Sequence, residues 1–543
     1  MRDRTGVLSP NFSTKSLARI RAARVDLASI AVVAGAFLIS VLTVIAKRVP
    51  LGHDESVYML RARDLGELGW SATSGDYWED YRAPGTSIIL SALRELVGLH
   101  VATSRAFVAL LATLMVILTW AIGRRLADRR VGLVGAVLLT LATGYVHASS
   151  FVLADVPGAA FSLAAVWLYA VDVQNQRLRF SFVTVPLLTL FACVSRFGAP
   201  FMLGAGFVGV SLFALPDVLR ERNRRLAVQA LLLGLVVTII CWVVLFTEFV
   251  SIKGESPVER NQRLVSFKQL SISTGFRDLW SVVNPWSGAR VQHLWSKPVA
   301  VIMALGVVAA IVGAILNRVP RRFVVGMAVA AAFSTIGITA SIGLIVSNYL
   351  VLCLPFWVLL AGSGLTWLGD LLVRPIRLAR VTPVFTALVA VVAGGLLVST
   401  ASEVRLIATR STASFVPIRA ASVELGETFG RRCVAVTSYT PQVGYYSGCK
   451  VTVFGTVVEV AEVVTQSLPE MLSDRLLSFD QLIRQGYQPV VFLVNRGKRQ
   501  PPEEAFQSTA VDAERLFEYS IGRGSRQTSW VQLIDPCVIE RNC

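Results

Sequence analysis

Apolar segments of about 20 residues recur between residues 25 and 401, and this is the length that a helix needs to cross a bilayer. The chain has 543 residues, of which 54% are hydrophobic and 16% charged, so a soluble fold is excluded for most of it. The sequence predicts a polytopic α-helical membrane protein with about 11 transmembrane helices. We expect these helices near residues 25–46, 101–123, 131–150, 156–173, 180–194, 198–216, 227–250, 298–316, 323–346, 348–368 and 381–401.

Arginine-rich connections alternate with arginine-poor ones between these segments. Basic clusters follow the second, fourth, sixth, eighth and tenth segments, and residues 1–24 form another cluster before the first. Because cytoplasmic connections are enriched in Arg and Lys, we expect a cytoplasmic N-terminus and an extracytoplasmic C-terminal portion in a plasma (inner) membrane. The same rule accounts for the net charge of +17, so we expect membrane lipids as partners and no nucleic acid.

Polar residues from several distant connections fall together on the predicted outer face. They lie in two outer loops, 47–100 and 251–297, and at the ends of the helices that carry Asp155, Arg196 and Asn348. Within the first loop, residues 86–100 fit either an extension of the second span or an amphipathic helix at the interface. Ionisable groups beside a bilayer are costly and usually face a cavity or a partner. We therefore expect one site on this face.

Each candidate residue also has a structural interpretation. Asp54 and Asp155 each stand where a helix begins, where a carboxylate caps the helix or, alternatively, acts as a general base. Arg196 fits either an interfacial arginine or a clamp on a phosphate. Arg82 is a second candidate for the clamp, and Tyr349 also fits an aromatic-belt residue.

Four short motifs then resemble the GT-C superfamily of integral-membrane glycosyltransferases, in the branch of the protein O-mannosyltransferases and lipid A aminoarabinose transferases. They are Asp54-Glu55-x-x-Tyr58, Tyr81-Arg82-Ala83-Pro84, Ala154-Asp155-Val156-Pro157 and Asn348-Tyr349-Leu350 with Pro355. Two positions depart from the pattern. Val57 stands where some relatives have Arg, and Ala83 stands where aminoarabinose transferases have no small residue.

The resemblance implies transfer of a sugar from a polyprenyl-phosphate donor to a hydroxyl on a cell-wall or lipid glycan or a protein, with inversion. It implies Asp54 as the base, with Glu55 and Asp155 in support. Arg82 and Arg196 would bind the donor phosphate. The implied substrate-binding residues are Tyr58, Tyr81, Asn348 and Tyr349. The alternative is a transporter or flippase of lipid-linked glycans with an external binding domain, although the spans have few charges near their middles.

Residues 402–543 have the composition of a soluble domain, with short apolar runs that favour strands alternating with helical segments. The pattern predicts an α/β domain with a partly parallel sheet and a helix over residues 512–519. Cys433 with Cys449, and Cys537 with Cys543, are the natural disulfide pairs, although four cysteines allow three connectivities. No cofactor is predicted. Carboxylates at Asp54 and Asp155 leave a Mg²⁺ or Mn²⁺ ion open as an alternative.

Overall fold

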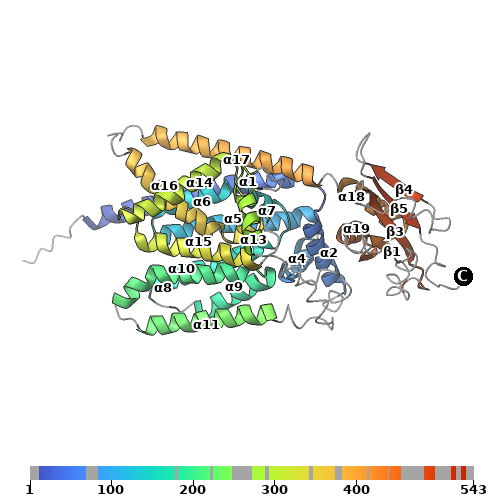
Figure 1. Ribbon diagram of the computed structural model, residues 1–543, viewed down its shortest axis with the longest axis horizontal. Coiled ribbons are helices and arrows are strands. Elements are labelled where there is room, and N and C mark those ends of the chain that lie inside the picture. Colours follow the sequence, from blue (N-terminus) through green and yellow to red (C-terminus); the bar gives the residue numbers. More distant parts are fainter. Residues whose placement is uncertain are drawn as a thin grey trace, which may run out of the picture.

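A bundle of long helices forms most of the protein, and a smaller unit of helices and strands lies at one end of it (Figure 1). The computed structural model describes residues 11–68, 83–98, 100–176, 178, 181–220, 224–246, 272–287, 293–341, 346–373, 382–412, 415–437, 439–453, 482, 484–495, 515–520 and 528–533. The sequence motif at residues 81–82 and most of the 251–297 loop lie outside these ranges.

The helices follow the apolar segments closely. The first half contains α1 (Asn11–Ile45), α2 (His53–Leu68), α4 (Gly85–Val97), α5 (Val101–Leu126), α6 (Arg129–Thr140), α7 (Thr143–Ser150), α8 (Asp155–Gln174), α9 (Ser181–Ser195), α10 (Ala199–Arg220) and α11 (Arg224–Phe246). The second half contains α13 (Ile272–Val283), α14 (Lys297–Ile315), α15 (Arg321–Ser341), the 3-10 turn η2 (Tyr349–Leu352), α16 (Leu354–Val373) and α17 (Thr382–Thr412).

The expected polytopic helical architecture is confirmed. In the part of the chain that the structure describes, eight helices are long and apolar enough to cross a membrane, or nine if the pair α6 and α7 is one span. That pair bends by 66°, so the segment expected at 131–150 is not one straight helix. The remaining expected spans, 180–194 and 381–401, correspond to α9, which has 15 residues, and to α17.

The uncertain segment after the first outer loop forms a helix of its own. Helix α4 ends at Gly98, whose φ of 78° lies in the region that favours glycine. Gly98 and the extended residue His100 separate α4 from α5, so residues 86–97 do not extend the second span. The guanidinium of Arg94 donates to the carbonyl of Arg63 at 2.9 Å, which ties α4 to α2.

The arginine-rich connections contact one another at one end of the bundle. Their side-chain pairs are Arg129 and Arg124 with Asp26, Arg125 with Asn175, Arg130 with Asp370, and Arg322 with Asp217. These pairs bring together the first turns of the first span and the connections after the second, fourth and tenth spans. A separate pair, Arg322 with Asp217, joins the end of the sixth span to the connection after the eighth. The alternation in the sequence therefore corresponds to one end of the molecule.

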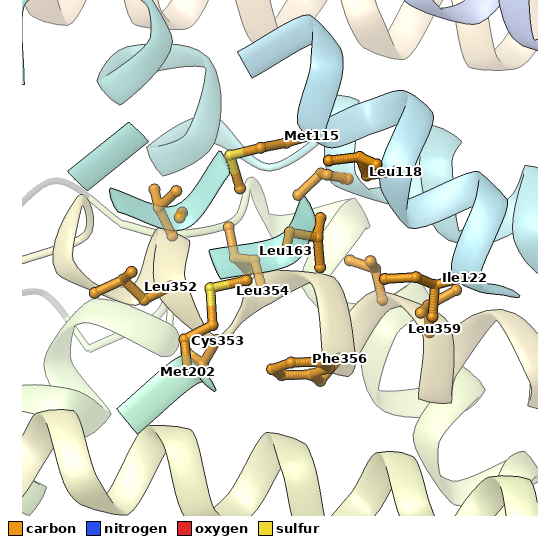
Figure 2. Packing of buried hydrophobic residues seen from close by; sticks show 14 of the residues in the cluster. Met115, Leu118, Ile122, Leu163, Met202, Leu352, Cys353, Leu354, Phe356 and Leu359 are labelled. Carbon is orange, nitrogen blue, oxygen red and sulfur yellow. The ribbon is translucent and has the colours of Figure 1, made fainter. Parts of the chain in front are cut away.

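Buried apolar side chains from α5, α8, α10 and α16 fill the middle of the bundle, where Leu163 and Phe356 lie among them (Figure 2). Small residues allow some helices to approach more closely than these large side chains would. A Cβ at Gly209 of α10 would lie 2.6 Å from the carbonyl oxygen of Gly326 on α15, and the reverse distance is also 2.6 Å. Backbones in membrane bundles approach in this way where both helices carry glycine.

The C-terminal part contains a five-stranded sheet of order β2-β1-β3-β5-β4. Its strands are β1 (Cys433–Thr437), β2 (Lys450–Val453), β3 (Gln488–Asn495), β4 (Arg515–Ser520) and β5 (Thr528–Leu533), with helices α18 (Val416–Thr428) and α19 (Thr440–Ser447). Strand β1 pairs parallel with β2 and β3, while β5 pairs antiparallel with β3 and β4. The sheet is therefore partly parallel, as the alternation predicted.

One expectation for this part was wrong. Residues 512–519 were expected to be helical, but Arg515–Ser520 form strand β4, because pairing with β5 outweighs the local helical pattern. Helix α17 continues past the composition change at Ser402 to Thr412. Figure 1 shows α2 and α4 between the bundle and the sheet, with α19 facing them.

Candidate functional site

Asp155, Arg196 and Asn348 come from three distant parts of the chain and meet at one point. Asp155 is the first residue of α8, and its Oδ1 lies 2.9 Å from Nε of Arg196. The side-chain amide of Asn348 donates to Oδ2 of Asp155 at 3.0 Å. The carboxylate is 2% exposed, whereas the arginine side chain is 19% exposed. The guanidinium is therefore held by a buried anion, on a side chain that is itself partly exposed.

Local backbone geometry brings Arg196 to this position. Arg196 follows the last residue of α9, and its amide donates to the carbonyl of Ala192 at 2.9 Å, which closes the helix. Helix α8 has Gly158 one turn after Asp155, and a Cβ there would lie 2.6 Å from Cβ of Arg196. Glycine is therefore needed for α9 to end against α8.

The ring of Tyr349 packs against the guanidinium of Arg196. The guanidinium carbon of Arg196 lies 4.5 Å from the centre of the Tyr349 ring, a distance typical of a cation–π contact. Burial raises the pKa of the Tyr349 phenol above its ordinary value, so its hydroxyl stays protonated at neutral pH. Asn348 and Tyr349, at the start of the turn η2, thus supply an amide and a phenol to the same cluster.

Helix α2 adds Asp54 and Tyr58, which are four residues apart and therefore on one face of that helix. Asp54 interacts electrostatically with both Asp155 and Tyr349, and Tyr58 interacts with Arg196. Tyr58 is buried, whereas Asp54 is only partly buried. Two carboxylates, one arginine, one amide and two phenols thus share one region. We call this group the outer cluster: Asp54, Tyr58, Asp155, Arg196, Asn348 and Tyr349.

Glu55 lies next to Asp54 in the sequence but has different surroundings. It is 1% exposed, and its two carboxylate oxygens lie 2.6 and 2.7 Å from Nε and Nη2 of Arg105. The amide of Val152 donates to the same carboxylate at 3.0 Å, and the amide of Gly52 does so at 3.4 Å. Both oxygens are therefore engaged by protein donors, and the pair joins α2 to α5 and to the segment before α8.

Arg105 is the residue that sequence reasoning missed. It lies in the second turn of an apolar helix, is 1% exposed, and also donates to the carbonyl of Val49 at 3.1 Å. Its guanidinium stacks 5.1 Å from the ring centre of Phe151. The sequence signal that could have identified Arg105 is a cation near the start of a long apolar segment, because such a cation needs an anionic partner inside the protein.

The proline-containing motif is described only from Ala83 onward, so Tyr81 and Arg82 lie outside the described residues. Pro84 precedes α4, and Gly85 begins it. A Cβ at Gly85 would lie 2.6 Å from the carbonyl oxygen of Val194 and 2.8 Å from the amide of Ser195. The motif therefore returns to the bundle directly beside the end of α9, next to Arg196.

The donor set of the outer cluster does not suit a divalent cation. The two oxygens of Asp155 face a guanidinium and an amide N–H, and a fixed positive charge beside them opposes a metal ion. Among the described residues, no group of three or more His, Cys, Asp or Glu side chains is placed to hold a metal. We derive no step through Mg²⁺ or Mn²⁺.

One of the expected disulfides is present. Cys433 and Cys449 are bonded, with their Cα atoms 4.8 Å apart, and they join the start of β1 to the residue before β2. Cys537 and Cys543 lie outside the described residues. Cys193 and Cys353 are buried in the bundle as free thiols, and Cys241 is partly buried.

Comparison with known proteins finds a family model that matches part of the chain and solved structures with a similar fold. Residues 81–245 match the family model described as dolichyl-phosphate-mannose-protein mannosyltransferase. The fold is similar to that of ArnT from Cupriavidus metallidurans bound to undecaprenyl phosphate, with a TM-score of 0.56 and 15% identity over 93% of this chain and 97% of that chain. The chain therefore shares the fold of this ArnT structure.

The likeness to ArnT extends over most of both chains. The apo structure of the same ArnT gives a TM-score of 0.53 and 15% identity, covering 94% of this chain and 98% of that one. An apo oligosaccharyltransferase from Archaeoglobus fulgidus gives a TM-score of 0.48 and 11% identity over 86% and 69% of the two chains. No curated protein sequence matches the chain.

Proposed function

We propose that this protein is a GT-C glycosyltransferase, which transfers a sugar from a polyprenyl-phosphate donor to a hydroxyl acceptor at the outer face of the membrane. The observation that carries the proposal is the ion pair between Asp155 and Arg196, with Asn348 and Tyr349 around it and Asp54 beside it. The match to a dolichyl-phosphate-mannose-dependent family supports this donor class, and so does a similar fold that binds undecaprenyl phosphate.

In the reaction, the bond between the anomeric carbon and the phosphate oxygen breaks as the acceptor oxygen bonds to that carbon. The carboxylate of Asp54 accepts the hydroxyl proton, as general-base catalysis requires. The polyprenyl phosphate leaves as an anion, and the partly exposed guanidinium of Arg196 stabilises the developing charge. Attack opposite to the leaving group inverts the anomeric centre. No metal ion takes part in these steps.

The remaining residues of the outer cluster orient the groups that react. Asp155 and Asn348 hold Arg196 in place, and Tyr349 supports its face. Tyr58 and Tyr349 present phenol groups that suit contacts with sugar hydroxyls. Arg82, which the sequence places just before Ala83 and the end of α9, is proposed as the second phosphate ligand, and Tyr81 as a sugar contact.

Glu55 is proposed to hold α2 in place, because both its oxygens are engaged by Arg105 and by backbone amides. Protein donors therefore already occupy the positions from which an acceptor hydroxyl would approach this carboxylate. Of the two adjacent acids in α2, Asp54 is therefore the better base. Val152, whose amide contacts Glu55, lies just before α8 and Asp155, so Glu55 also links the two halves of the cluster.

The proposed orientation has a cytoplasmic N-terminus and the sheet outside the cell. It rests on the arginine-rich connections, which gather at the bundle end away from the outer cluster. A disulfide in the sheet suits an extracytoplasmic compartment. Helix α13 exposes Phe276 and Trp280 one turn apart, and Trp286 follows it, as expected of residues at a membrane interface.

The test supplies the purified protein with a panel of polyprenyl-phosphate sugars together with glycan, lipid and protein acceptors, and measures released polyprenyl phosphate. We expect release that depends on both one donor and one acceptor. Inverted stereochemistry of the product checks the mechanism. Donor movement across proteoliposomes without any release would instead identify a transporter or flippase of lipid-linked glycans.

A further inference from the structure

Helix α19 of the C-terminal part docks directly on α2, the helix that carries Asp54. The backbone amide of Leu51, two residues before α2, donates to the hydroxyl of Tyr446 at 2.8 Å. Further along α2, the guanidinium of Arg63 donates to the carbonyl of Gly444 at 2.8 Å. Both bonds come from the second half of α19, and they reach one position before α2 and one within it.

An apolar cluster lies between these two hydrogen bonds. Leu51, Tyr58 and Met59 are almost fully buried, and Tyr445 and Tyr446 of α19 pack against this group. Tyr58 belongs both to this cluster and to the outer cluster, where it faces Arg196. Tyr58 therefore links the contact with α19 to the site.

The same two tyrosines also surround the buried ion pair of Glu55 and Arg105. Tyr445 and Tyr446 each interact electrostatically with Glu55 and with Arg105. Burial raises the pKa of Tyr445 to about 12 and also raises the pKa of Tyr446, so both hydroxyls stay neutral beside this pair. Tyr446 therefore accepts the hydrogen bond from Leu51 as a neutral phenol.

The sheet fixes α19 at each end. The helix connects β1 to its parallel neighbour β2, and the Cys433–Cys449 disulfide closes this same segment. Gly448 ends α19 with a φ of 72°, in the region that favours glycine, and its amide donates to the carbonyl of Gly444. The position of α19, and through it that of Leu51, is thus set by the sheet.

We propose that α19 positions the catalytic helix, with Tyr446 as the positioning residue that holds the start of α2 and hence Asp54. Tyr446 does not touch the reacting atoms. Loss of its hydroxyl leaves the buried amide of Leu51 without this partner and loosens the first turn of α2. This inference rests on the proposed function for its catalytic consequence, whereas the docking itself is measurable without any substrate.

The test compares Tyr446→Phe with the matched control Tyr445→Phe, which removes a hydroxyl from the neighbouring tyrosine of the same helix. Hydrogen exchange of the Leu51 amide and of the first turn of α2 is measured in the full-length protein. We expect roughly tenfold faster exchange in Tyr446→Phe, as loss of one hydrogen bond allows, and no change in the control. Exchange in α5 serves as an internal reference and stays the same in all three proteins.

The second readout is turnover of the donor identified in the assay above. A misplaced base lowers kcat while KM for the donor stays near the wild-type value, because Asp155, Arg196 and Asn348 all lie outside α2. Unchanged exchange in Tyr446→Phe overturns the inference, as does faster exchange with normal kcat. If the wild-type protein transfers no sugar, the proposed function fails by itself, and the exchange of Leu51 still decides whether α19 holds α2.

Discussion

The carboxylate of Asp155 and the guanidinium of Arg196, 2.9 Å apart, join the first turn of α8 to the residue after α9. The aspartate is almost fully buried, whereas the arginine is partly exposed. An ion pair of this kind orients the cation for a ligand and at the same time neutralises a charge that the protein cannot hydrate. We therefore expect both the stability of the protein and the proposed binding of a phosphate to depend on it.

Arg196→Gln is expected to lower the free energy of unfolding by about 3 kcal/mol, because a buried carboxylate loses its counter-charge. It also abolishes release of polyprenyl phosphate. The matched control is Arg322→Gln, which breaks an exposed pair with Asp217 and costs at most about 1 kcal/mol. Thermal and denaturant unfolding in detergent measure both. Equal effects in the two variants contradict a special role for the Asp155 pair.

Asp54→Asn is expected to reduce turnover by about 10²- to 10⁴-fold, the usual contribution of a general base. Its effect on stability is small, about 0.3–1 kcal/mol, because it removes one negative charge from the first turn of α2. The check is a donor-release assay at matched protein concentrations, together with unfolding of the same sample. An active Asp54→Asn protein removes this residue from the mechanism.

Glu55→Gln is expected to affect stability more than turnover, and to lower the free energy of unfolding by about 3 kcal/mol. The buried Arg105 then lacks a full counter-charge, although the side chain keeps its shape. Replacing both partners, in Glu55→Leu with Arg105→Met, restores part of the stability because no unpaired charge is left. A double-mutant cycle on the free energy of unfolding measures the coupling. Additive losses show that the two residues act independently.

Loss of the disulfide in Cys433→Ser with Cys449→Ser is expected to destabilise the sheet by about 3 kcal/mol, since the bond closes a short loop. The unfolding of the bundle stays the same, because the bond joins β1 to the residue before β2. Limited proteolysis and unfolding with and without reductant provide the measurement. Reductant destabilises the wild-type protein more than the double variant, in which this bond is already absent, and equal effects in the two contradict the prediction.

Gly85→Ala is expected to separate α4 from the end of α9, because the new methyl group would meet the backbone of Val194 and Ser195. Overpacking of this kind costs about 1–3 kcal/mol, and it moves the neighbour of Arg196. Gly234→Ala on α11 is the control, since no atom lies within 4 Å of its added Cβ. Activity and melting temperature both fall in the first variant only. Wild-type values for Gly85→Ala contradict the close approach.

Much of this architecture follows from the sequence by itself. Segment length and apolar content determine the spans, because a bilayer accepts only helices or closed barrels across its core. The alternation of arginine determines which connections share an end, and so places Asp54, Asp155, Arg196 and Asn348 on one face. Strand β1 and the Cys433–Cys449 bond were predicted from short apolar runs and cysteine spacing.

Only the tertiary structure decided which of these groups touch. The sequence does not show that Glu55 pairs with Arg105 while its neighbour Asp54 turns toward Asp155, because adjacent residues of a helix point in different directions and their partners come from other helices. It missed strand β4, where pairing with β5 outweighs local preference. It also did not show that Tyr446 reaches Leu51, since contacts over such a separation in the chain depend on the packing of the whole fold.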